Sequence, residues 1–303
     1  MTKKEFSLAS NYDGLSLKGM IFEPDGERKG VLQLVHGMCE YKERYEKTME
    51  FFTEKGFVVA CYDQRGHGDS VQTAADRGWF GDRSGKAIVE DCAQVVRYLK
   101  TEYPDLPLNL FGHSMGSMVV RCYLQDYDGE IDKLIVCGSP VDNPLAGMAV
   151  FMTKIIGLFR GQRHRSKMLA YLSTGKGNDN FPGEGRGAWL SRNRENIAAD
   201  YASEKSNYIF TCNGFENLFN LMKRTYTKKG YSLQNPDLPI FFISGGDDAV
   251  LGGEKNFAKT LDFLRARGYT QVSGKLYEGL RHELLNELDN AEVYADILTF
   301  LEK

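Results

Sequence analysis

A short motif near the middle of the chain restricts the possible folds more than any other part of the sequence. The apolar run Leu108 to Phe111 has the length of a buried strand, and from Met115 onward apolar residues recur at helical spacing. Between the two lies Gly112-x-Ser114-x-Gly116, the pattern of a nucleophile elbow, in which a tight strand-to-helix turn lifts a serine hydroxyl above a sheet. Side chains at the glycines would collide with the neighbouring strand and helix. The motif predicts a serine nucleophile, so the rest of the chain must supply a base, an acid and an oxyanion hole.

Strands and helices alternate along most of the chain. The expected strands cover residues 5–10, 15–23, 30–35, 57–62, 108–111, 131–137, 239–244 and 272–277. The expected helices cover residues 44–55, 85–102, 254–267 and 283–302, together with the helix that follows the motif. Alternation of this kind implies a mainly parallel sheet with helices on both faces. The predicted fold class is therefore α/β, doubly wound.

One long segment breaks the alternation. Residues 141–236 contain helical patterns and polar loops but no convincing strand. An insertion of this length between sheet strands is either functional or a small subdomain, rather than a bare loop. We expect residues 1–140 and 237–303 to form the α/β core, and residues 141–236 to form a helical cap over the mouth of the site.

Composition argues against several classes of protein. The 303 residues carry a formal net charge of −3 without a long basic stripe, so we expect no nucleic-acid partner. No stretch approaches the roughly 18 apolar residues of a membrane span, and the first residues lack the apolar region of a secretory signal. The six cysteines have no paired spacing, which suits reduced thiols in the cytoplasm. Without a Cys/His cluster or a glycine-rich phosphate loop in the sequence, we expect no metal and no cofactor.

The base should follow the nucleophile in the chain, because this type of elbow uses the order serine, acid, histidine. Only His164 and His282, of five histidines, lie after Ser114. His164 belongs to a basic stretch of the insertion, where a solvated role is the simpler interpretation. His282 follows the strand that ends near Tyr277, and catalytic groups of such sheets lie beyond the carboxyl ends of strands. We therefore expect His282 to be the base.

Three aspartates are candidates for the acid. Asp142 follows the strand expected at residues 131–137, whereas Asp247 and Asp248 follow the strand at residues 239–244. We favour Asp248, because the preceding Gly-Gly-Asp can form a turn that directs the next carboxylate toward the base. Asp247 and Asp142 stay as alternatives, with a solvated turn as the ordinary role of whichever residues are not the acid.

These residues together predict acyl-transfer chemistry. Ser114 would attack an acyl carbonyl while His282 takes its proton and later returns it to the leaving group. Asp248 would hold the imidazole in the required tautomer. Two backbone N–H groups should stabilise the oxyanion: that of Met115, at a helix N-terminus, and that of Met38, in the loop after the strand at residues 30–35.

Five segments, in order along the chain, resemble the motifs of one known family. They are His36-Gly37-x-x-Glu40-x-x-x-Arg44-Tyr45, Asp63-x-Arg65-Gly66-His67-Gly68-x-Ser70, Gly112-His113-Ser114-Met115-Gly116, Gly245-x-x-Asp248 and Arg281-His282-Glu283. The family is the monoacylglycerol lipase and lysophospholipase-like branch of the α/β-hydrolases. The resemblance implies the α/β-hydrolase fold, a triad of Ser114, Asp248 and His282 with oxyanion amides at Met38 and Met115, and no cofactor.

The resemblance further implies a serine carboxylic-ester hydrolase that cleaves single-acyl lipid esters, monoacylglycerol or lysophospholipid, through an acyl-enzyme. Two departures limit it. Ala249 stands where many bacterial members have proline, and the cap beyond Arg192 matches weakly although the cap selects the substrate. A general short-chain esterase, a peptidase or amidase of the same fold, and a non-catalytic binding protein therefore stay open as alternatives.

The start of the insertion is strongly apolar, which suggests a role in substrate binding. Its large apolar residues are Met148, Val150, Phe151, Met152, Ile155, Ile156 and Leu158. We expect this helix to border the entry for a single acyl chain, with Met148, Phe151, Met152 and Ile155 in contact with substrate, although helical spacing alone is also met by a packed core. The basic run at residues 160–167 leaves two alternatives, transient contact of the cap with a membrane surface or, as is commoner for charge runs, a solvated face.

Overall fold

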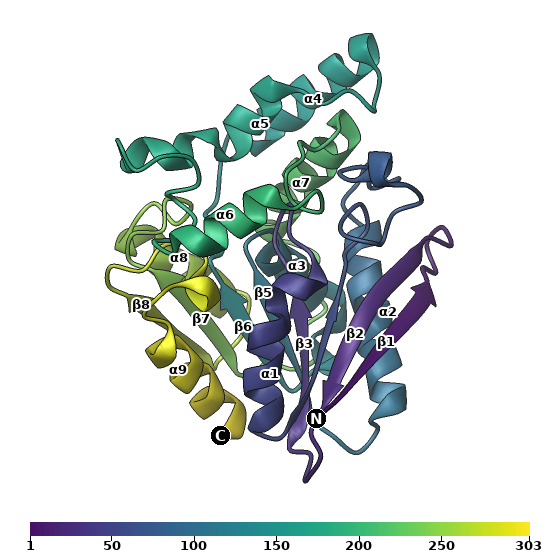
Figure 1. Ribbon diagram of the computed structural model, residues 1–303, viewed down its shortest axis with the longest axis vertical. Helices are drawn as coiled ribbons and strands as arrows, with labels where there is room; N and C mark the ends of the chain where they lie inside the picture. Colours follow the sequence, from purple (N-terminus) through teal and green to yellow (C-terminus); the bar gives the residue numbers. More distant parts are fainter.

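One sheet of eight strands organises the protein, as the computed structural model shows for residues 1–303, the side chain of Lys176 aside (Figure 1). The strands are β1 (Thr2–Ala9), β2 (Ser16–Glu23), β3 (Gly30–Val35), β4 (Phe57–Tyr62), β5 (Leu108–His113), β6 (Lys133–Cys137), β7 (Ile240–Gly245) and β8 (Val272–Tyr277). Their order in the sheet is β1-β2-β4-β3-β5-β6-β7-β8. The hairpin β1–β2 is antiparallel and joins β4 antiparallel, whereas every other neighbouring pair is parallel.

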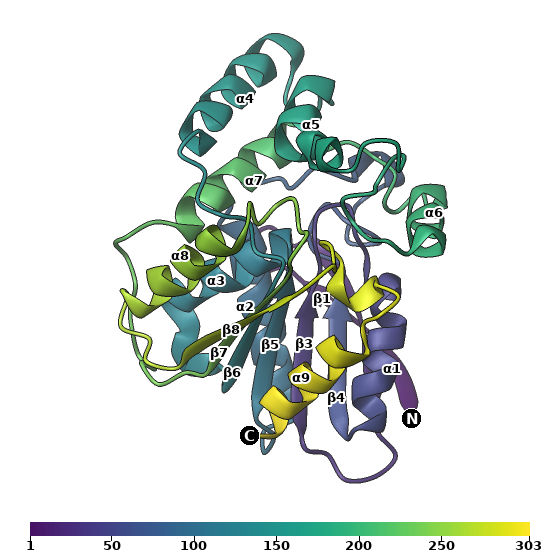
Figure 2. The ribbon, with the colours of Figure 1, turned by 90° about the vertical axis from the view of Figure 1, so that its left-hand side faces the viewer.

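Helices cover both faces of this sheet. They are α1 (Glu46–Glu54), α2 (Ala87–Glu102), α3 (Met115–Tyr127), α4 (Ala146–Arg160), α5 (Lys167–Thr174), α6 (Arg194–Ala202), α7 (Cys212–Thr225), α8 (Glu254–Arg265) and α9 (Ala291–Glu302). Helices α1 and α9 lie against one face, and α2, α3 and α8 against the other (Figure 2). Every residue of β3, β4 and β5 is buried, which explains why these strands read as continuous apolar runs. The doubly wound α/β fold expected from the sequence is confirmed.

The C-terminal helix differs from the prediction. We expected it to begin at residue 283, but α9 begins at Ala291, after a short 3₁₀ turn at Leu284–Asn286. Glu283 and Glu287 are buried and accept hydrogen bonds from the insertion, Glu283 from Asn196 at 2.8 Å and Glu287 from Ser191 at 3.0 Å. The chain is therefore in a loop conformation where these carboxylates bind the insertion, and α9 begins only after it.

The insertion between β6 and β7 lies beyond the carboxyl ends of the parallel strands, above the sheet in Figures 1 and 2. It contains α4, α5, α6 and α7, and α7 packs both on α3 of the core and on α4. A stripe of mostly small residues on α4 makes the latter contact: Ala146, Val150, Thr153 and Gly157. In the part of the chain that the structure describes, the helices are all too short or too polar to cross a bilayer.

Candidate active site

The predicted nucleophile elbow is present between β5 and α3. Ser114 has φ 53° and ψ −115°, a backbone conformation that residues other than glycine rarely adopt outside such strained turns. A Cβ atom on Gly116 would lie 2.1 Å from the carbonyl oxygen of Val35, and one on Gly112 would lie 2.5 Å from that of Gly116. The backbone of the turn therefore approaches its neighbours so closely that only glycine fits at these two positions.

The structure brings the three residues predicted as nucleophile, base and acid into one hydrogen-bonded chain. The Oγ atom of Ser114 lies 2.8 Å from Nε2 of His282. Nδ1 of the same ring lies 2.9 Å and 3.0 Å from the two carboxylate oxygens of Asp248. Both His282 and Asp248 are buried, so water does not compete for these contacts. The distances are those expected of a nucleophile, a base and an orienting acid.

The surroundings of Asp248 favour its ionised form. Its carboxylate accepts hydrogen bonds from the Oγ of Ser244 at 3.1 Å and from the N–H of Val250 at 2.8 Å. Burial acts to raise the pKa of Asp248, but His282 and these two donors outweigh it, so the pKa lies below its ordinary value. The alternatives Asp247 and Asp142 are both exposed at the surface.

His164, the other histidine considered as base, lies in the insertion between α4 and α5. Its backbone carbonyl accepts a hydrogen bond from the N–H of Cys212 at 2.8 Å. Its contacts belong to the packing of the insertion, away from Ser114.

The two predicted oxyanion donors lie at the same end of the sheet. Met115 is the first residue of α3, so its N–H has no acceptor within the helix. Met38 lies in the loop after β3, and both Met38 and Ser114 line one cavity. Glu40 holds this loop, because its Oε2 accepts the N–H of Gly37 at 2.5 Å. A carbonyl bound at Ser114 would thus lie near two backbone amides, as an oxyanion hole requires.

A cavity of about 630 Å³ lies over Ser114 and His282. Loops of the core form its floor, and the insertion forms its walls through α5, α6 and the segments on either side of α6. The wall residues from the insertion include the apolar and aromatic Ala170, Tyr171, Trp189, Leu190, Tyr201, Tyr208 and Ile209, and the polar Thr174, Asn178, Arg186, Asp200, Ser206 and Asn207. The ring of Trp189 packs 5.0 Å from that of His282, centroid to centroid. The cavity thus offers both apolar and polar walls to a substrate.

The predicted acyl-chain contacts on α4 need correction. Met148, Phe151 and Ile155 are 59%, 63% and 40% exposed, and Met152 is half-buried. The described residues that line the cavity include none of these four. Because α4 uses its small residues to pack on α7, its large ones face outward. Helical spacing showed which residues share a face but not which face the rest of the protein covers. In the structure α5, rather than α4, contributes to the cavity wall.

A network of charges, in which Glu40 and Glu283 are buried, also lines the cavity. The guanidinium of Arg44 donates to Glu40 and to Glu283, each at 2.9 Å, and lies 3.2 Å from Asp200 on α6. Burial, followed by the charges of Glu283 and Glu40, raises the pKa of Asp200 to about 6, although Arg44 acts in the opposite direction. Asp200 and Trp189 could not be predicted as site residues from the sequence, because residue spacing does not show which positions of the insertion lie next to the core.

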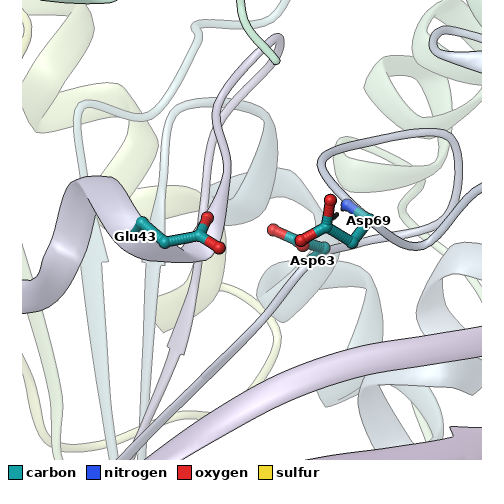
Figure 3. A group of neighbouring side chains, drawn as sticks. All are labelled: Glu43, Asp63 and Asp69. Carbon is teal, nitrogen blue, oxygen red and sulfur yellow. Dashed lines mark hydrogen bonds between the residues drawn. The ribbon is translucent and has the colours of Figure 1, made fainter. Parts of the chain in front are cut away.

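A second charged group joins the insertion to the core. The carboxylates of Glu43, Asp63 and Asp69 lie within 4.8 Å of one another and point toward a common centre (Figure 3). The ammonium group of Lys42 bonds all three at 2.8–2.9 Å, and Lys205 of the insertion bonds Glu43 at 3.1 Å and Asp69 at 2.7 Å. Two lysines thus occupy the place that a cation would take, so we interpret the group as an ion-pair cluster.

Comparison with known proteins identifies the family. The model of the family described as serine aminopeptidase, S33, matches residues 26–289. The chain belongs to this family. It is therefore a serine hydrolase of the α/β-hydrolase type.

Relatives of this serine aminopeptidase S33 family member include lipid hydrolases. A monoacylglycerol lipase of Mycolicibacterium smegmatis is 25% identical over 99% of this chain and 97% of its own length. A probable lysophospholipase L2 of Haemophilus influenzae is 22% identical over 89% of this chain and 82% of its own. The structure of a thermostable carboxyl esterase from Bacillus coagulans, in complex with glycerol, superposes with a TM-score of 0.91 at 26% identity, covering 99% of this chain and 98% of that one. These relatives confirm the resemblance found in the motifs.

Proposed function

We propose that this protein hydrolyses single-acyl lipid esters, monoacylglycerols or lysophospholipids, through an acyl-enzyme on Ser114. The observation that carries the proposal is the hydrogen-bonded chain from Ser114 through His282 to Asp248 at the base of a walled cavity. The names of the relatives, monoacylglycerol lipase and probable lysophospholipase, support the choice of substrate class.

The geometry is suited to two successive acyl transfers. As Oγ of Ser114 attacks the ester carbonyl, its proton passes to Nε2 of His282, and the amides of Met38 and Met115 stabilise the oxyanion. Collapse of the tetrahedral intermediate expels the alcohol, which takes that proton and leaves an acyl ester on the serine. Water then repeats the sequence and releases the carboxylic acid. Asp248 stabilises the imidazolium in both halves of the reaction.

The cavity limits the number of acyl chains that fit. A volume of about 630 Å³ lies within the range of single small-ligand sites. Each buried methylene contributes about 0.8 kcal/mol, so specificity should rise with the length of one acyl chain until the cavity is full. We expect one-chain esters to be better substrates than triacylglycerols, whose three chains exceed the space.

A graded substrate panel tests this function. It should contain short aryl esters, monoacylglycerols of several lengths, lysophosphatidylcholine, triacylglycerol and an aminoacyl amide. We expect kcat/KM to be highest for the one-chain lipid esters. If kcat/KM does not change with acyl length, the protein is a general esterase. If the amide is the better substrate, it is a peptidase or amidase. Loss of labelling by a fluorophosphonate probe in Ser114→Ala would identify the nucleophile independently of substrate.

We further propose that the outer side of the insertion contacts lipid surfaces. Large apolar residues exposed on α4, on α5 and at their ends form the α4–α5 apolar surface: Leu145, Met148, Phe151, Ile155, Leu158, Phe159, Met168 and Leu172. Leu158 and Phe159 are 78% and 80% exposed. Arg160 at the end of α4 and Lys167 at the start of α5 are exposed as well and carry the positive charge that anionic headgroups attract. Such a surface would bring the cavity close to an interface rich in lipid esters.

Sedimentation with vesicles tests this contact. Wild-type protein should bind phosphatidylcholine vesicles that contain phosphatidylglycerol, and Phe159→Asp should reduce binding at least several-fold. Leu288→Asp is the matched control, because Leu288 is 67% exposed but lies in the loop before α9. Equal binding by wild type and Phe159→Asp would contradict the proposal.

A further inference from the structure

The histidine that precedes the nucleophile has a hydrogen-bond acceptor on each side of its ring. Nδ1 of His113 lies 3.3 Å from Oε2 of Glu40, and Nε2 lies 3.2 Å from the backbone carbonyl oxygen of His282. The ring is buried between them. A neutral imidazole has one N–H and can serve only one of two acceptors, whereas the imidazolium has two. The contacts of His113 therefore match its charged form.

The charges around His113 agree with this assignment. Burial acts to lower the pKa of His113, but the charge of Glu40, its hydrogen bond, and the charge of Glu283 outweigh it, so the pKa lies above its ordinary value. The groups that face the ring come from two loops. Glu40 lies after β3, and His282 and Glu283 follow β8, with Arg44 paired to both glutamates.

The peptide bond that follows His282 is held at both of its polar atoms. Its carbonyl oxygen faces His113, and its N–H, which belongs to Glu283, donates to the carbonyl oxygen of Leu190 in the insertion at 2.8 Å. A peptide held on both sides has little freedom to rotate, so the position of the His282 Cα and the direction of its Cα–Cβ bond are restrained. The other acceptor of His113, Glu40, binds the N–H of Gly37 in the oxyanion loop. One side chain thus links the loops of the base and of the oxyanion hole.

We propose that His113 is a positioning residue whose doubly protonated ring aligns the base His282 with Ser114 and ties this alignment to the oxyanion loop through Glu40. The inference rests on the proposed function, since it concerns the same site. It assigns to the histidine of the elbow a role in catalysis that acts through His282 and the oxyanion loop.

Two amide substitutions separate the two contacts. The side-chain nitrogen of His113→Gln can take the place of Nε2 and keep the bond to the carbonyl of His282. The nitrogen of His113→Asn can take the place of Nδ1 and keep the bond to Glu40. His113→Leu removes both. The three variants are compared on a short aryl ester, with active enzyme counted by fluorophosphonate titration and folding checked by thermal unfolding.

We expect His113→Leu to lower kcat about 100-fold with KM nearly unchanged, the effect of a misplaced catalytic group. His113→Gln should lose roughly tenfold or less, and His113→Asn should lose nearly as much as His113→Leu. A roughly tenfold separation of kcat between His113→Gln and His113→Asn at nearly unchanged KM is a result that a purely structural role would not give, because both variants place a neutral amide at this position.

Each outcome decides the matter. Wild-type kcat in His113→Leu, or equal losses in His113→Gln and His113→Asn, would overturn the inference. If His113→Leu does not fold, the other two variants decide, because both keep a polar group at the site. Full activity of Ser114→Ala would refute the proposed function itself. An inactive Ser114→Ala beside fully active His113 variants would refute only this inference.

Discussion

The core and the insertion use large apolar side chains in opposite ways. In the core, Phe52, Phe111 and Tyr123 are fully buried against the sheet, in the two clusters that cover its faces. On α4, the buried positions are mostly small and the large side chains face outward. Apolar burial therefore stabilises the scaffold that holds the triad, whereas the outer side of the insertion keeps its apolar area for another surface to cover.

The part of the insertion next to the core follows a third pattern, since polar pairs fix it. Asp200 faces Arg44, and Lys205 enters the carboxylate cluster of Figure 3. Side chains from this part also form the walls of the cavity. Under the proposed function, chemistry belongs to the core, substrate choice to the side chains of the insertion that line the cavity, and contact with the surroundings to the α4–α5 apolar surface.

The largest expected effect tests whether chemistry belongs to the core alone. Ser114→Ala and His282→Ala should each lower kcat about 10⁶-fold on every ester, because members of a triad act as a unit. His164→Ala, a histidine of the insertion, should leave kcat unchanged. The measurement is turnover of a short aryl ester by folded protein. A large loss of kcat in His164→Ala would show that the insertion also contributes to the chemical step.

The acid gives the next largest effect. Asp248→Asn should lower kcat roughly 10⁴-fold, because His282 then loses the carboxylate that sets its tautomer. Asp247→Asn, the adjacent exposed residue, should change kcat by less than about tenfold. If Asp247→Asn proves the more damaging, the assignment of the acid is off by one residue.

A matched pair in the insertion tests where substrate choice resides. Tyr171 and Phe151 are both half exposed or more, but only Tyr171 lines the cavity. Tyr171→Asp should lower kcat/KM for long-chain monoacylglycerol about tenfold and spare a short aryl ester. Phe151→Asp should leave both unchanged when the substrate is dispersed as monomers. If instead Phe151→Asp lowers kcat/KM for the long-chain substrate and Tyr171→Asp does not, α4 rather than α5 contacts the acyl chain.

The last prediction concerns stability rather than activity, through the contact between α6 and the core. The pKa of Asp200, about 6 in the folded protein, lies above its ordinary value of 3.8, so the folded state binds the proton more tightly. The stabilisation from Asp200 is therefore complete below about pH 4 and is lost as pH rises through about 6. As the pH rises from about 4 to about 7, the unfolding free energy of Asp200→Asn should increase by roughly 2–3 kcal/mol relative to that of wild type. Denaturant unfolding measures this, with exposed Asp142→Asn as control; equal pH trends in wild type and Asp200→Asn would contradict the assignment.

The sequence predicted the sheet well, because its signals are local. Strands buried on both faces read as mostly apolar runs, and β3 and β4 occur at the expected residues. The elbow was also predicted from its local pattern. Contacts within the strand–turn–helix unit require glycine at 112, whereas the close approach of Val35, from the neighbouring strand, requires it at 116. Chain order and strand ends then selected His282 and Asp248, which the structure places beside Ser114.

Only the tertiary structure decided what each surface of the insertion touches. The outward direction of α4, the position of Trp189 over the base and the burial of Asp200 against Arg44 all depend on partners far away in the chain. The same holds for His113, which the motif contained but whose two acceptors come from loops after β3 and β8. Periodicity states which residues share a face. Long-range packing determines what covers that face, and burial and charge then follow from that packing.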